Sequence, residues 1–111
     1  MAADRKPTIA MSRAAARGLR LRAQQPPSRR GGTAVGLARA RDIRARRVLS
    51  WDTIARMASY FARHEVDKEA EGFREGEDGY PSKGLQAWLL WGGDAGKAWA
   101  DRLMDSKDSG Y

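Results

Sequence analysis

The sequence predicts an all-α protein, a small bundle of three to five short helices with a basic N-terminal arm. Apolar residues in its second half recur at spacings of three and four, which is the period of one helix face. No segment of strand length alternates apolar and polar residues, and helix-capping residues precede the periodic segments. A length of 111 residues is enough for one domain with tails.

Charge divides the chain into two regions. Residues 1–50 contain 13 Lys and Arg against two acids, whereas residues 51–111 contain 8 against 12 together with all nine aromatic residues. Because large apolar side chains supply most buried area, we expect residues 48–104 to form the helical core. Residues 1–47 would form an Arg-rich arm that becomes ordered on a partner, and residues 105–111 would form a flexible tail.

One or two short helices are expected in the basic arm. Ser12 can cap a helix that continues to about Gln24 and ends at the two following prolines. Thr33 can cap another to about Arg47, although arginines project over most of its circumference. The segment between them, residues 25–32 (QPPSRRGG), is typical of an extended, flexible linker.

The core region has clearer helix signals. Ser50 is a capping residue before an amphipathic helix, Ser82 begins another, and Asp94 can cap the last helix after a stop at Gly92 and Gly93. Residues 65–81 are acidic and rich in glycine, which indicates a surface loop. The expected inner faces contain Trp51, Ile54, Met57, Ala58, Phe61, Leu85, Trp88, Leu89, Ala95, Ala98, Trp99 and Leu103.

Three stretches resemble a small domain that recurs in bacteriophage and prophage proteins, sometimes appended to head-morphogenesis proteins. They are GLARARDI, LSWDTIARMASYFARHEVDKEAEGF and GYPSKGLQAWLLWGGDAGKAWA, which lie in roughly the last two-thirds of the chain. The resemblance implies a phage origin and a link to virion or genome handling. It supplies no catalytic residue.

Clustered arginines are the main candidate for a binding site. Guanidinium groups bind phosphate bidentately, and neutralising phosphates gives salt-dependent affinity through counterion release. We therefore expect contact with a nucleic-acid backbone, without base readout, or with an acidic protein surface such as another subunit's acidic loop. The candidate residues are Arg13, Arg17, Arg20, Arg29, Arg30, Arg39, Arg41, Arg44, Arg46 and Arg47.

The acidic loop has a spacing similar to that of a calcium-binding EF-hand. Glutamates stand where the shorter Asp or Asn is needed, and the twelfth position holds Asp in place of a bidentate Glu. A solvated acidic loop is the better interpretation. The residues concerned are Asp67, Glu69, Glu71, Gly72, Glu75 and Asp78.

No active site is predicted. Lys68 occupies the position at which a zinc-protease helix beginning at His64 would need its second histidine, so His64 is interpreted as a helix C-terminal residue or a hydrogen-bonding partner of the loop. Gly92, Gly93, Gly96 and Lys97 miss the phosphate-loop spacing by one residue, and a glycine stop explains them better. We expect no metal, no cofactor and no enzyme activity.

The tryptophans have two interpretations. Trp88, Trp91 and Trp99 could stack bases or dock a partner, but a small domain needs its large apolar groups inside. Core packing is therefore favoured. Trp91 is the expected exception, because it lies off the apolar stripe of its helix.

These features favour a non-enzymatic phage-type virion structural or head-assembly protein, whose partners are other virion or assembly subunits and nucleic acid. The alternative is a free, sequence-nonspecific nucleic-acid-binding protein that acts in the infected cell. No apolar stretch is long enough for a signal sequence or a membrane span, and there is no cysteine. The expected location is the virion or the host cytoplasm.

Overall fold

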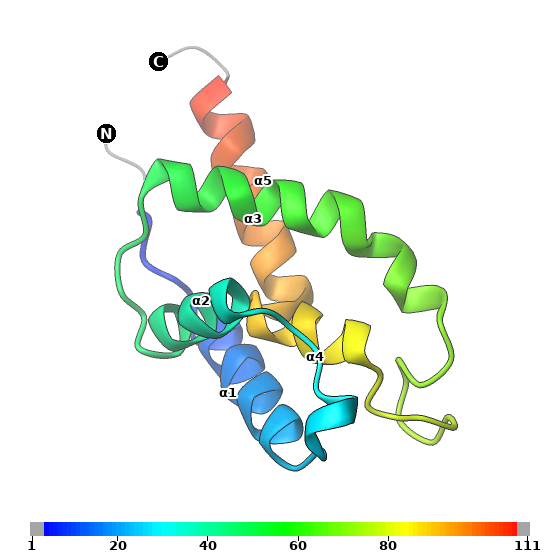
Figure 1. The fold of residues 1–111 in the computed structure, drawn as a ribbon. Coiled ribbons are helices and arrows are strands. Elements are labelled where there is room, and N and C mark those ends of the chain that lie inside the picture. The colour runs from blue at the N-terminus through cyan, green and yellow to red at the C-terminus, as the bar shows by residue number, and fades with distance from the viewer. Residues whose placement is uncertain (1–3, 109–111) are drawn as a thin grey trace.

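The computed structural model describes residues 4–108, which form five α-helices and two short 3-10 helices and contain no strand (Figure 1). The predicted all-α fold, with at most five helices, is confirmed. None of the helices in this range is long and apolar enough to cross a membrane. In chain order the elements are α1 (Ile9–Ala23), η1 (Pro27–Arg29), α2 (Ala34–Arg44), α3 (Trp51–His64), η2 (Glu65–Glu69), α4 (Lys83–Leu90) and α5 (Gly93–Asp108).

Three helices begin at the predicted capping residues. The hydroxyl groups of Thr33, Ser50 and Ser82 each accept a hydrogen bond from the backbone N–H three residues further on, at 3.0–3.1 Å. Each bond satisfies one of the N–H groups that a helix start leaves unpaired. The capping residues therefore predicted correctly where α2, α3 and α4 begin.

The boundaries of α1 and α2 differ from those predicted. Thr8, not Ser12, caps α1 by accepting from the N–H of Met11 at 3.2 Å. Ser12 donates instead to the carbonyl oxygen of Arg44 at 2.7 Å, which holds the first turn of α1 beside the end of α2. α2 stops at Arg44 because Arg46 has a φ of 55°, a left-handed conformation that a helix cannot contain.

The hydrophobic core includes both halves of the chain. Met11, Ala15, Ala40 and Ile43 are completely buried in one cluster with the aromatic residues of α3, α4 and α5. The prediction that the core is confined to residues 48–104 is therefore wrong. The prediction failed because it located the core by its aromatic residues. The buried faces of α1 and α2 consist of small and medium side chains instead.

Helix α1 packs closely on both α4 and α2 (Figure 1). A Cβ atom placed on Gly18 would lie 2.9 Å from the Cβ of Leu89 and 2.9 Å from the backbone nitrogen of Leu90. Only glycine allows this approach. The basic helix is thus part of the folded unit, and contacts within the chain position it without a partner.

The aromatic residues form the other part of the core. Phe61 packs edge-on against Trp88, with ring centroids 4.8 Å apart. Trp88, Trp91 and Trp99 are all buried, which confirms core packing for Trp88 and Trp99. Trp91, predicted to be the exception, is only 8% exposed and is also a core residue.

The segment predicted as a flexible linker is fastened to α4 by Gln86. This side chain is completely buried; its Oε1 accepts from the N–H of Gly31 at 2.8 Å, and its Nε2 donates to the carbonyl oxygens of Arg29 and Pro81 at 3.0 and 2.9 Å. Arg22 adds a bond from Nε to the Gly31 carbonyl at 2.9 Å. Contacts within the chain therefore account for the path of residues 25–32.

The predicted C-terminal tail is only partly described. Residues 105–108 belong to the last turn of α5 and so correct the prediction that a flexible tail begins at residue 105. Residues 109–111 lie outside the described range.

Candidate functional site

The ten candidate arginines divide into two groups of five. In the first group the guanidinium groups are occupied by partners within the chain, with donor–acceptor distances of 2.5–3.6 Å. The partners are backbone carbonyl oxygens, a tyrosine hydroxyl and an aspartate carboxylate, so these arginines contribute to the fold. The pairs are Arg17 with Tyr80, Arg30 with Gln25, Arg46 with Pro7, and Arg39 and Arg47 with Asp42.

The second group consists of exposed arginines whose guanidinium groups form no hydrogen bond and no ion pair among residues 4–108. We call them the outer arginines. A free guanidinium keeps all five N–H donors available to an anion. The outer arginines are Arg13, Arg20, Arg29, Arg41 and Arg44.

The outer arginines are arranged by helix geometry. Arg13 and Arg20 are seven residues apart, so they lie two turns apart on one line along α1, opposite its buried residues. Arg41 and Arg44 are three residues apart and are neighbours on α2. Since Ser12 bonds to the carbonyl of Arg44, the cations of α1 and α2 lie on adjoining helices.

The acidic loop does not gather its carboxylates. No three His, Asp or Glu side chains in the described part of the chain are placed to hold a metal ion. Glu77 turns inward, and its Oε1 accepts from the N–H groups of Gly72 and Arg74 at 3.1 and 2.9 Å. The carboxylate therefore holds the loop in shape.

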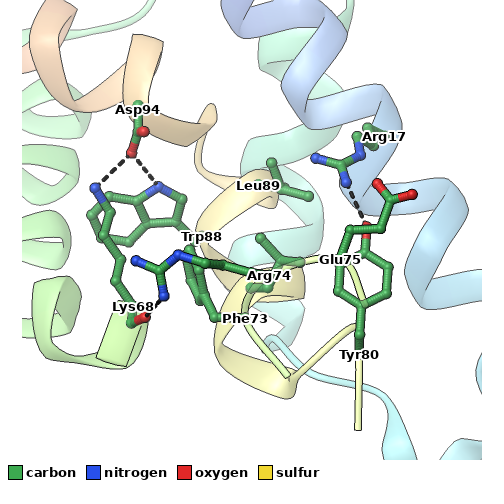
Figure 2. A pocket seen from close by; sticks show the side chains of 10 residues that line it. Arg17, Lys68, Phe73, Arg74, Glu75, Tyr80, Trp88, Leu89 and Asp94 are labelled. Carbon is green, nitrogen blue, oxygen red and sulfur yellow. Dashed lines mark hydrogen bonds and ion pairs between the residues drawn. The ribbon is translucent and has the colours of Figure 1, made fainter. Parts of the chain in front are cut away.

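A cavity of about 420 Å³ lies between this loop and helices α1, α4 and α5. Figure 2 shows the side chains that line it. On one side Asp94 accepts two bonds at the same oxygen, from Lys68 Nζ at 2.8 Å and from Trp88 Nε1 at 3.0 Å. Lys68 also lies 4.7 Å from the centre of the Trp88 ring. These three side chains connect η2, α4 and the start of α5, and no pattern in the sequence predicted this cluster. Asp94 is therefore not the predicted cap, since α5 already begins at Gly93.

The charges of this cluster are fixed near neutral pH. The hydrogen bond from Lys68 lowers the pKa of Asp94, and the same bond raises the pKa of Lys68 against the opposing effect of burial. A proton donor or acceptor useful at pH 7 needs a pKa close to 7, and both shifts move away from it. Both groups therefore keep their charges over a wide pH range, and the ion pair links η2 to the start of α5.

The other two cations that line the cavity are also paired within the chain. Arg17 donates from Nη2 to the hydroxyl of Tyr80 at 2.5 Å, and Arg74 donates to the carbonyl of Lys68 at 3.1 Å (Figure 2). Each of the three cations that line the cavity thus already donates to a partner within the chain. It offers less to an anion than the outer arginines do.

His64 has the role predicted for it. It is the last residue of α3, and its Nδ1 lies 3.0 Å from Oδ2 of Asp67 in the following turn. The predicted glycine stop is also present, because Gly92 and Gly93 have φ values of 107° and 64° where α4 ends. These conformations explain the glycines without a phosphate loop.

Comparison of the chain with protein-family models, with curated proteins and with solved structures finds no match.

Proposed function

We propose that this chain is a non-enzymatic protein of a phage-type assembly that binds the nucleic-acid backbone, without sequence preference, through the outer arginines of α1, η1 and α2. The observation that carries the proposal is that five exposed arginines have no partner among residues 4–108, in a region with 13 basic and two acidic residues. Arginines retained only for folding would be paired, as the other five are. The phage context rests on the sequence resemblance.

The geometry favours contact with phosphates over reading of bases. The outer arginines are distributed over two helices that are packed together and over η1, so they do not belong to a single helix that could insert into a groove. Backbone contacts position a protein on nucleic acid but carry no sequence information. Affinity should therefore be similar for unrelated sequences and should fall steeply with salt.

Salt dependence tests the proposal. The five outer arginines are replaced by glutamine, and binding to a B-form duplex is measured over a range of salt concentrations. Each lost phosphate contact flattens the logarithmic slope by about 0.9, so the variant should lose up to about four units of slope. Affinity should fall equally for unrelated sequences.

A charge-matched pair of variants separates a local surface from net charge. Arg41→Gln with Arg44→Gln removes two charges from α2, and Arg102→Gln with Lys107→Gln removes two from α5. The first pair should flatten the slope by about two units and the second should leave it nearly unchanged. Equal effects of both pairs would reject the α1–α2 surface. An unchanged slope in the five-residue variant would reject nucleic acid and favour an acidic protein partner.

A further inference from the structure

A second cavity, of about 540 Å³, lies where the start of α2, the C-terminal half of α3 and the first turns of α4 meet. Its volume is within the range of small-molecule sites. It is distinct from the outer arginines, none of which lines it. Both halves of the chain contribute to it, since Thr33 and Val35 come from the basic half and Tyr60 and Trp91 from the aromatic half.

Three rings stack along one wall of the cavity. Tyr60 lies between the other two, with its centroid 4.8 Å from Trp91 at an interplanar angle of 13°, and 4.6 Å from His64 at 26°. Tyr60 and Trp91 are buried, and burial raises the pKa of Tyr60, with a further contribution from Asp67. The tyrosine thus stays a neutral, apolar ring at physiological pH.

His64 is the accessible end of this stack. Its side chain is 41% exposed, and Tyr60 is the one ring that stacks on it in the described part of the chain. The contact between Nδ1 and Asp67 fixes the orientation of the imidazole, while Nε2 contacts no described partner. A flat ligand can continue the stack on the exposed side of this ring.

The rim of the cavity is cationic. Arg56, Arg63 and Lys83 line it with one carboxylate, that of Asp67, which is already bonded to His64. Arg56 is paired with Asp52 at 3.1 Å, so Arg63 and Lys83 are the cations that remain for a ligand. Lys83 has no ionic partner among residues 4–108, and one nitrogen of Arg63 donates to the Ser59 hydroxyl at 2.7 Å, which leaves its other donors available.

Backbone donors add to the attraction for an anion. At the start of α2, Thr33 satisfies the N–H of Gly36 with its hydroxyl and that of Leu37 with its carbonyl. The N–H groups of Ala34 and Val35 therefore have no acceptor within the helix, at the positive end of its dipole. Thr33 and Val35 both line the cavity.

We propose that this cavity binds a nucleoside monophosphate. The base stacks on His64, and the phosphate is held by Arg63, Lys83 and the start of α2. A flat aromatic group joined to a phosphate matches the combination of stacked rings and cations better than a purely apolar ligand or an inorganic anion does. This site does not depend on the surface proposed for nucleic-acid backbone, because the two share no side chain.

Calorimetric titration with adenosine monophosphate, adenosine and inorganic phosphate tests the proposal. The nucleotide should bind at least about tenfold more tightly than either fragment, which is a difference of about 1.4 kcal/mol in binding free energy. Absence of saturable binding at millimolar nucleotide would overturn the site. Equal affinity for inorganic phosphate would also overturn it, because the rings would then contribute nothing.

Variants locate the binding. Lys83→Gln removes an exposed cation and should weaken nucleotide binding by about tenfold, because one charge-assisted hydrogen bond to the phosphate is lost. His64→Ala should weaken nucleotide binding but leave the weaker phosphate binding unchanged. Lys107→Gln, on α5 and outside both the cavity and the outer arginines, is the matched control and should have no effect. Equal losses in the control would reject the cavity, and none of these titrations depends on the duplex-binding measurements.

Discussion

Helices α1 and α2 are buried through small and medium side chains alone, whereas α3, α4 and α5 bury aromatic rings among their aliphatic side chains. In the first region the contacts are made by Met11, Ala15, Gly18 and Ala40. Because these residues occupy only a narrow face, the remaining circumference is free to carry arginine. The comparison shows that a strongly basic helix can belong to the core and still present cations to a partner.

Arginine itself differs in role between positions of the basic region. Arg5, Arg22 and Arg46 each donate to a carbonyl oxygen of another segment, at 2.8–3.0 Å, and so join the N-terminal half together. The outer arginines make no such bonds within the described chain. The arginines that form one cluster in the sequence therefore have two roles in the structure. Some join segments of the fold, and others are exposed on its surface.

The largest expected effect on stability is that of a substitution in the aromatic part of the core. Trp88→Ala removes a buried indole and should lower the free energy of unfolding by about 3–5 kcal/mol through lost burial and the cavity left behind. Urea denaturation followed by circular dichroism measures the change. A loss below about 1 kcal/mol would show that the aromatic cluster is not the main support of the fold.

An intermediate effect is expected on the small-residue side. Alanine is favoured over glycine in a helix by about 1 kcal/mol, so Gly18→Ala would stabilise an isolated helix. In the packed protein the added Cβ meets Leu89 and the backbone of Leu90, and overpacking should lower the free energy of unfolding by about 1–3 kcal/mol. A stabilised variant in the same denaturation assay would mean that α1 does not pack on α4.

The smallest effect concerns the ion pair that joins the acidic loop to α5. Asp94 is 76% exposed, so Asp94→Asn should cost less than about 1 kcal/mol. The lowered pKa of Asp94 means that its stabilisation is present above the ordinary value of 3.8 and is lost as the pH falls through the folded value. The raised pKa of Lys68 means that the stabilisation from its protonated form is fully present below pH 10.5. It is lost as the pH rises through the pKa of Lys68 in the folded protein.

Thermal melting of Asp94→Asn beside the unsubstituted protein checks both limits. The difference in stability should be constant between about pH 5 and pH 9 and should shrink outside that window. A difference that varied strongly within the window would assign the effect to another titrating group.

The parts of the fold that local pattern specifies could be predicted from the sequence. Ser50 and Ser82 stand before apolar residues at helical spacing, and α3 and α4 begin after them. The contacts of Gln86 could not be predicted, because its partners lie 55 and 57 residues away and a glutamine in a helix usually faces water. The close approach of α1 to α4 at Gly18 could not be predicted either. A glycine inside a helix lowers its helix propensity, and its packing partner is not visible in the sequence.

The candidate sites show the same limit. Composition pointed to the ten arginines, but it could not separate paired from unpaired side chains, which depends on partners such as Asp42 and Tyr80. Stacking of Tyr60 between His64 and Trp91 joins residues from two helices, and no spacing along the chain encodes it. Single residues were recognisable from sequence, and their combinations required the structure.

Native-state hydrogen exchange tests the central claim, that the basic half is part of one core, most directly. Amide protons in α1 near Met11 and Gly18 should open with the same free energy as those in α3 near Phe61, because both helices are released only when the common core unfolds. Exchange in α1 at a free energy several kcal/mol lower, with α3 still fully protected, would contradict the account. It would restore the picture of a separate arm attached to an independent aromatic domain.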